Sequence, residues 1–81
     1  MEEVINILQA RFPDAVIRLE KDDDSEYING NIVWAGFRDV SFLERQRLVY
    51  NPLRDALGDR AQQVSMVFTY TPNEYEQLKA A

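Results

Sequence analysis

The sequence predicts an α+β fold: a single domain with a three-stranded mixed sheet and helices packed on one face. Two kinds of pattern lead to this class. Some stretches alternate apolar and polar residues, as strands do, and others repeat apolar residues every three or four positions, as helices do. The expected order is helix, strand, strand, helix, helix, strand, helix. A chain of 81 residues has room for one core, so one domain over residues 1–81 is expected.

The first part of the chain is expected to form a helix and a β-hairpin. Apolar residues recur at helical spacing along residues 4–12, and Pro13 ends this stripe. Apolar and charged residues then alternate along residues 15–21, which predicts a half-buried strand. A short acidic loop leads into a second strand at residues 27–35, in which Gly30 is a candidate bulge. Because the loop is short, the two strands should pair antiparallel.

The middle of the chain is expected to hold two helices. Ser41 and Glu44 have the spacing of a capping box, and an apolar helical face follows them. Pro52 has no amide donor and disfavours helical geometry in Asn51, so a break is predicted there, followed by a shorter helix that ends at Gly58. A connection of this length allows the next strand to join the sheet in parallel.

Residues 63–70 and 71–80 predict the last strand and the last helix. The alternation places on one strand face Val64, Met66, Phe68 and Tyr70. We interpret the strand aromatics, including Trp34, as core rather than as a platform for stacking nucleic-acid bases, because no lysines are interleaved with them. The sequence TPNE places Thr71, Pro72 and Glu74 at the cap and in the first turn of the terminal helix.

Composition weighs against catalysis, and we predict a protein that is not an enzyme. The chain has no cysteine and no histidine, which excludes disulfides, thiolate metal sites and the usual general base at neutral pH. The acidic loop at residues 22–26 lacks the glycine and distal glutamate of a calcium loop, so no metal site is predicted. No apolar run approaches the length of a membrane span and the N-terminus opens with acids, so we expect a cytoplasmic protein without membrane contact.

Arginines gather in the middle of an acidic chain. The net charge is −5, and residues 1–37 hold eight acids against three bases. This balance argues against nonspecific nucleic-acid binding, but residues 38–60 hold five arginines against four acids. A local surface that binds phosphates is therefore one interpretation, and its candidate residues are Arg38, Arg45, Arg47 and Arg54. A solvated helix face is the plainer alternative.

Several strings resemble the BolA-like family, and the resemblance extends over nearly the whole chain. FPDAVI resembles the segment that precedes the first strand in this family. Its motif of phenylalanine, any residue, glycine, any residue and serine resembles FRDVS, where Asp39 replaces the glycine. Its arginine-histidine-arginine helix resembles ERQRLVYNPL, where Gln46 replaces the histidine. TYTPNEY is similar to the family's C-terminal motif of threonine, proline and glutamate.

This resemblance implies an α+β fold similar to the class II KH arrangement and a partnership with monothiol glutaredoxins in handling 2Fe–2S clusters or iron in the stress response. Some members of the family are regarded as transcriptional regulators. In the cluster complexes a histidine at the start of the third strand supplies one ligand, and a cysteine or histidine in the hairpin loop can supply another. These positions fall on Gln63 and on Glu26 and Tyr27. Because amide and phenol oxygens are poor ligands for clusters held by thiolates, any cluster would be held by the partner.

The leading hypothesis is a non-enzymatic adaptor, a divergent BolA-like member without the family histidine, that binds a protein partner. The predicted partner-binding residues are Arg45, Gln46, Arg47, Gln63 and Val64. One alternative is a transcriptional regulator that binds nucleic acid through a helix-turn-helix-like pair around Pro52. Another is a divergent structural or oligomer-forming domain. The sequence leaves the partner and the oligomeric state open.

Overall fold

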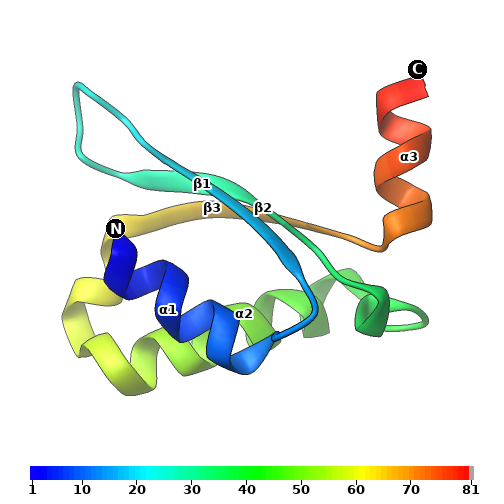
Figure 1. Cartoon of the computed structure of the whole chain (residues 1–81). Helices are drawn as coiled ribbons and strands as arrows, with labels where there is room; N and C mark the ends of the chain where they lie inside the picture. The colour runs from blue at the N-terminus through cyan, green and yellow to red at the C-terminus, as the bar shows by residue number, and fades with distance from the viewer. Residues whose placement is uncertain (81) are drawn as a thin grey trace.

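In a computed structural model, which describes residues 1–80, a three-stranded sheet lies against a layer of two helices (Figure 1). The elements, with η for a 3-10 helix, are α1 (Glu2–Arg11), β1 (Val16–Lys21), β2 (Ile28–Val33), η1 (Ala35–Phe37), α2 (Phe42–Leu57), η2 (Gly58–Gln63), β3 (Val64–Tyr70) and α3 (Pro72–Ala80). The central strand β2 pairs antiparallel with β1 and parallel with β3. The predicted α+β class and mixed sheet are therefore confirmed.

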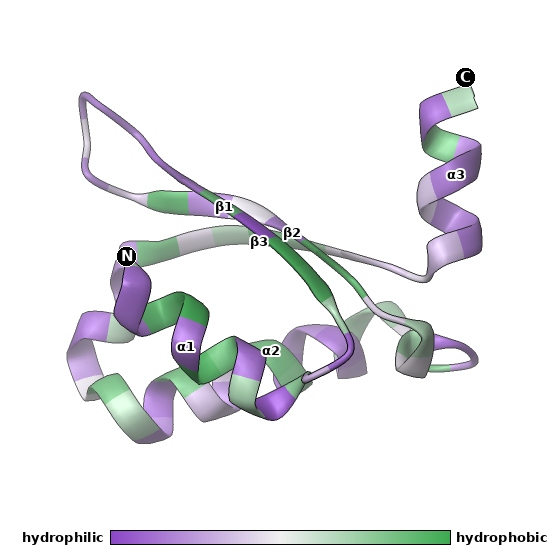
Figure 2. Cartoon of the chain, viewed as in Figure 1, coloured by the Kyte–Doolittle hydropathy of each residue, from purple (hydrophilic) through white to green (hydrophobic). Residues whose placement is uncertain are grey.

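The hydrophobic core lies between the sheet and the helices α1 and α2. Its fully buried members are Leu8, Phe12, Ile32, Phe37, Val49, Leu53 and Val67. The ring of Trp34 packs edge-on against those of Phe12 and Phe37, with centroid distances of 4.9 and 5.1 Å. Trp34 is thus part of the core, as predicted. Hydrophobic segments of α1, α2 and the strands are visible in Figure 2.

Helix α2 runs without a break through Pro52, so the predicted pair of helices is wrong. Val49 and Leu53 lie one turn apart on either side of the proline, and both are fully buried. Continuing the helix keeps these side chains on one core-facing stripe, which offsets the hydrogen bond that the proline removes. The helix ends at Gly58, whose φ of 58° suits glycine, and η2 follows.

The apolar residues of β3 are divided between its two faces. Ile28 pairs with Val64, but Asn29 pairs with Met66, so Ser65 is an extra residue in the ladder. The irregularity leaves Val64 buried on the helix side and turns Met66 and the alternate residues that follow to the other face. The prediction that one core face holds Val64, Met66, Phe68 and Tyr70 is therefore wrong. Gly30, the predicted bulge, lies instead in regular pairing with Leu19.

Helix α3 lies apart from the two-helix layer. Figure 1 shows it rising from the end of β3, on the side of the sheet away from α1 and α2. None of its described residues is buried, so the prediction that helices pack on one face holds for α1 and α2 only. Its predicted cap is confirmed: the amide of Glu74 donates to Thr71 Oγ1 (3.2 Å), and the amide of Thr71 donates to Glu74 Oε1 (2.9 Å).

The loop before α2 contains a residue with an unusual backbone conformation. Asp39 has a φ of 61°, in the left-handed region that glycine adopts most readily. This is the position at which the BolA-like motif has its glycine. Two residues later Ser41 caps α2, because its Oγ accepts the amide of Glu44 at 3.2 Å, as predicted from the sequence.

Candidate functional site

Side chains of α2 cover the free edge of β3. Three alternate carbonyls of this strand accept hydrogen bonds, from Tyr50 Oη to Ser65 O (3.1 Å), from Gln46 Nε2 to Val67 O (3.2 Å) and from Arg45 Nη1 to Thr69 O (3.4 Å). Because β3 is an edge strand, these carbonyls would otherwise be open to pairing with another chain. Burial raises the pKa of the Tyr50 hydroxyl, which keeps it a proton donor. Gln46 therefore ties α2 to the sheet.

Arg45 joins α2 to the start of α3 from a buried position. Its guanidinium donates to both carboxylate oxygens of Glu74, at 2.7 and 3.1 Å, and its Nε donates to Val40 O at 2.9 Å. The side chain is only 11% exposed, and its Cζ lies 5.6 Å from the centre of the Phe37 ring. A two-pronged pair of this kind fixes the relative position of the two helices. Arg45 is therefore not available on the surface, which corrects both predictions that placed it there.

The same contact changes the acidity of Glu74. Hydrogen bonds from Arg45, followed by the one from the Thr71 backbone, lower the pKa of Glu74 from 4.5 to about 2. A carboxylate whose pKa is lowered in the folded state stabilises that state above its unfolded pKa. The contribution is lost as the pH falls from 4.5 through about 2. Because 45% of the side chain is exposed, solvent screening limits this contribution to about 1 kcal/mol.

Lowering the pH should therefore weaken the attachment of α3, because Glu74 becomes protonated. We expect the free energy of unfolding of the native chain to fall as the pH is lowered from 4.5 towards 2, with a shallower fall in Glu74→Gln. Urea unfolding followed by circular dichroism at several pH values measures both slopes. Glu76→Gln, an exposed acid on the same helix, is the matched control. Equal slopes for Glu74→Gln and the native chain would contradict the assignment.

The structure separates the residues predicted to bind a partner. Val64 is 4% exposed and Gln46 is half-buried, so these two side chains support the fold. Arg47 is exposed, pairs with Glu44 at 2.9 Å and lines a surface hollow on the α1 side of α2, together with Arg11. Gln63 is exposed at the end of η2, one residue before β3. One continuous surface through Arg47 and Gln63, as the sequence suggested, is therefore not formed.

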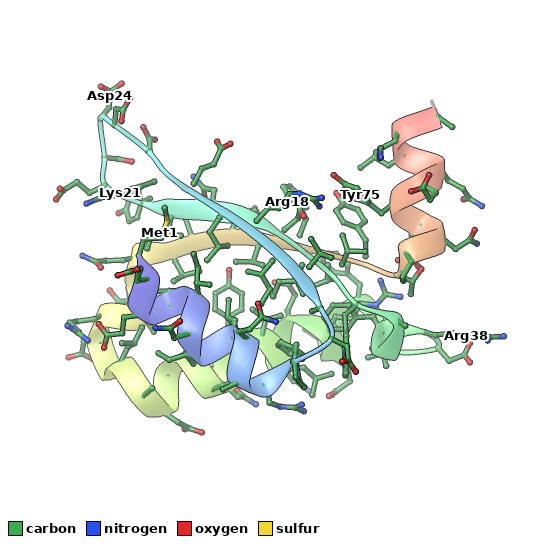
Figure 3. The ribbon with its side chains drawn as sticks, in the orientation of Figure 1. Met1, Arg18, Lys21, Asp24, Arg38 and Tyr75 are labelled. Atoms are coloured by element: carbon green, nitrogen blue, oxygen red, sulfur yellow. The ribbon has the colours of Figure 1, made fainter. Side chains whose placement is uncertain are left out.

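The four arginines proposed for phosphate contacts fall into two pairs and do not form one surface. Arg38 projects from the loop after η1 at one end of the molecule (Figure 3) and lines a hollow together with Arg45, whose guanidinium is largely buried and bonded to Glu74. Arg47 and Arg54 lie about two turns apart on the same side of α2, and Arg54 donates at 3.2 Å to Oδ1 of Asn51, which lines the same hollow as Arg47. Since α2 is continuous, the helix-turn-helix-like pair around Pro52 is absent from the described residues.

The two positions that the resemblance associates with a cluster meet at one end of the sheet. Ile28 pairs with Val64, so Tyr27 and Gln63, one residue before each, lie at the same end of neighbouring strands. Tyr27 is 50% exposed, while Glu26 occupies the hairpin turn with a φ of 64° and pairs with Lys21 at 3.5 Å.

A pocket of about 460 Å³ opens beside Gln63, between the end of α2, η2 and the start of β3. We call it the η2 pocket; its lining residues are Tyr50, Arg54, Gly58, Asp59, Ala61, Gln62 and Val64. Sequence reasoning missed this pocket, because its walls come from three elements and only the predicted helix end at Gly58 hinted at a bend there. Its lining includes one base, Arg54, and one acid, Asp59, which suits a polypeptide surface better than a single charged ligand.

Two further findings concern the described part of the chain. Among residues 1–80, no group of three or more histidine, cysteine, aspartate or glutamate side chains is arranged to hold a metal ion. Over the same residues, no helix combines the length and the apolar character needed to cross a membrane.

Comparison with known proteins agrees with this architecture. No protein-family profile matches the chain. The match to the structure of a BolA homologue from Coxiella burnetii covers 94% of this chain and 95% of the homologue's chain, with a TM-score of 0.69 and 23% sequence identity. An uncharacterized protein of Buchnera aphidicola, BU385, is 32% identical over 56 residues, which are 69% of this chain and 70% of that protein. The chain therefore belongs to the same family as this Buchnera protein, and it has the fold of the BolA homologue.

Proposed function

We propose that this chain is a non-enzymatic, BolA-like adaptor that binds a protein partner, with a monothiol glutaredoxin as the first candidate. The observation that carries the proposal is the sheet end at which Tyr27 and Gln63 meet beside the η2 pocket. The resemblance to the BolA-like family assigns cluster ligands to the corresponding positions in the complexes with glutaredoxin. The likeness of fold to the Coxiella BolA homologue supports transferring these positions at the level of the fold.

The donor atoms at this sheet end do not fit direct ligation of an iron–sulfur cluster. Gln63 offers a neutral amide, Tyr27 a phenol, and the carboxylate of Glu26 already pairs with Lys21. Clusters of this type are bound by thiolates and, in some proteins, by imidazoles. In this proposal the partner holds the cluster through its own ligands, and the chain contributes surface contacts alone.

The proposal is tested by titrating labelled protein with a monothiol glutaredoxin, first without and then with its cluster. We expect chemical-shift changes at the amides of Gln63 and Val64, with little change in the visible absorption of the cluster. Gln63→Ala should weaken binding by about five-fold, as expected for an exposed contact near the centre of an interface. Arg47→Ala, on the α1 side of α2, is the matched control.

A second variant tests the ligand argument separately from binding. Gln63→His introduces an imidazole at the sheet end, and we expect it to alter the visible absorption of the cluster in the complex, because a nitrogen donor can enter its coordination shell. No shifts with either form of the glutaredoxin would refute the partnership. Binding that is lost in Arg47→Ala and retained in Gln63→Ala would move the contact surface to the other side of α2.

A further inference from the structure

The sheet face away from α1 and α2 carries an ordered set of side chains. The strand pairing places them in three rows, which are Val16, Val33 and Tyr70; Arg18, Asn31 and Phe68; and Glu20, Asn29 and Met66. We call these nine residues the open sheet face. In Figure 3 Arg18 and Tyr75 lie above the sheet, on the side away from α1 and α2.

Apolar side chains are left uncovered on this face. Val16, Met66 and Phe68 are 49%, 50% and 48% exposed. Helix α3 reaches only one end of the face, where the Tyr75 ring lies 5.8 Å from that of Tyr70 and 5.4 Å from the Arg18 guanidinium. The sheet is mixed, with β1 and β2 antiparallel, and sheets with antiparallel pairs commonly leave one face open to solvent. This face is therefore exposed over β3 and accessible to a partner.

The middle row contains a polar atom without a partner. Asn31 Oδ1 is buried and accepts no hydrogen bond from the described residues. It lies at a hollow of about 340 Å³, lined by Arg18, Glu20, Asn29, Gly30, Asn31 and Phe68. A buried acceptor without a donor destabilises the fold, so such atoms are few in native proteins. Because this atom is closed to solvent, an N–H or O–H group of a bound molecule reaches it when the side chains around the hollow shift.

The charges beside the open sheet face indicate what kind of partner fits. The β1–β2 hairpin carries Asp22, Asp23, Asp24 and Glu26, and Glu20 lies on the face itself. Figure 3 shows Asp24 at the tip of this hairpin, raised to the same side of the sheet as Arg18 and Tyr75. With a net charge of −5, a second copy and a nucleic acid would both meet like charge. A basic protein segment would meet opposite charge.

From these observations we propose that the open sheet face binds a basic amphipathic helix of a protein partner. The apolar stripe of that helix packs on Met66 and Phe68, its basic flank faces the acidic hairpin, and one of its polar side chains donates to Asn31 Oδ1. Helices would then cover both faces of the sheet. The nine residues of the open sheet face do not include Tyr27 or Gln63, and Glu26 of the acidic hairpin lies next to that sheet end. The inference does not depend on the proposed function.

The test uses a synthetic helical peptide of about 14 residues, with leucines on one face and lysines on the other. A counterpart with glutamates in place of the lysines is the control peptide. We expect the lysine peptide to shift the amides of Arg18, Asn31 and Phe68 in labelled full-length protein. Phe68→Ser should weaken its binding about ten-fold, whereas Phe42→Ser, an exposed aromatic on α2, should leave it unchanged.

The charge argument is tested with a second pair of variants. Asp23→Asn with Asp24→Asn should weaken binding several-fold at low salt, while Asp14→Asn with Asp59→Asn, the same change of charge elsewhere, should not. Failure of the lysine peptide to bind, or equal binding of the glutamate peptide, would overturn the proposal. So would shifts confined to α2, concentration-dependent dimerisation through Phe68, or tighter binding of a single-stranded oligonucleotide at the same amides.

Discussion

Replacing Arg45 with alanine is expected to lower the free energy of unfolding by about 2–3 kcal/mol, because the change removes a largely buried guanidinium and several hydrogen bonds at once, among them the pair with the partly exposed Glu74. The guanidinium contacts Glu74 and the carbonyls of Val40 and Thr69. Without it, those carbonyls lose a charged donor in a place that water reaches poorly. Few other contacts hold α3, none of whose described residues is buried.

Urea unfolding of Arg45→Ala measures this loss, and amide exchange in α3 shows whether that helix is released first. Arg47→Ala is the control, because its exposed pair with Glu44 should contribute less than about 0.5 kcal/mol. The loss of stability in Arg45→Lys should lie between those of the two alanine variants, since an ammonium group cannot make the two-pronged contact. A loss of similar size in Arg45→Ala and Arg47→Ala would mean that the buried position of Arg45 has no energetic consequence.

Features with a local cause were predictable from the sequence. The helix before Pro13, the β-hairpin, and the caps at Ser41 and Thr71 depend on residues within a few positions of one another. Spacing and residue type report such contacts directly. The family resemblance added the candidate position Gln63, and the structure brings it next to Tyr27 through the pairing of β2 with β3.

Features caused by distant contacts were not predictable in this way. Gln46 bonds to a residue 21 positions away and Arg45 to one 29 positions away, so neighbouring residues give no sign of either contact. Both positions were therefore predicted to lie on the surface. In the structure the side chain of Arg45 is buried, and that of Gln46 lies along the edge of β3. Similarly, the burial of Leu53 outweighs the local preference of Pro52 to break a helix.

The open sheet face was missed for a related reason. An alternating strand pattern shows which residues share a face, but one extra residue at Ser65 exchanges the faces beyond it. Phe68 was therefore assigned to the core although nearly half of it is exposed. A signal was present, because Val67 and Phe68 are adjacent apolar residues and cannot both point to the same side of a regular strand.

Gly30→Ala is the second change for which we expect a large loss, of about 3 kcal/mol. A methyl group on Gly30 would lie 1.9 Å from the carbonyl oxygen of Arg18 and 2.8 Å from the Cα of Leu19. Both are backbone atoms of the paired strand, so no side-chain rotation relieves the clash, and β1 must move away from β2. That movement weakens the ladder that carries both the acidic hairpin and the open sheet face.

Thermal and urea unfolding of Gly30→Ala, with Asn29→Ala as the control on the same strand, separates this close approach from a general sensitivity of β2. Asn29→Ala removes a partly exposed side chain from the open sheet face and should cost less than about 1 kcal/mol. Because Gly30 also lines the hollow at Asn31, the folded fraction of Gly30→Ala should bind the lysine peptide less tightly. Equal stability of Gly30→Ala and Asn29→Ala would contradict this prediction. It would mean that β1 and β2 can move apart at this point without a loss of stability. The glycine at position 30 would then need a cause other than the proximity of Arg18.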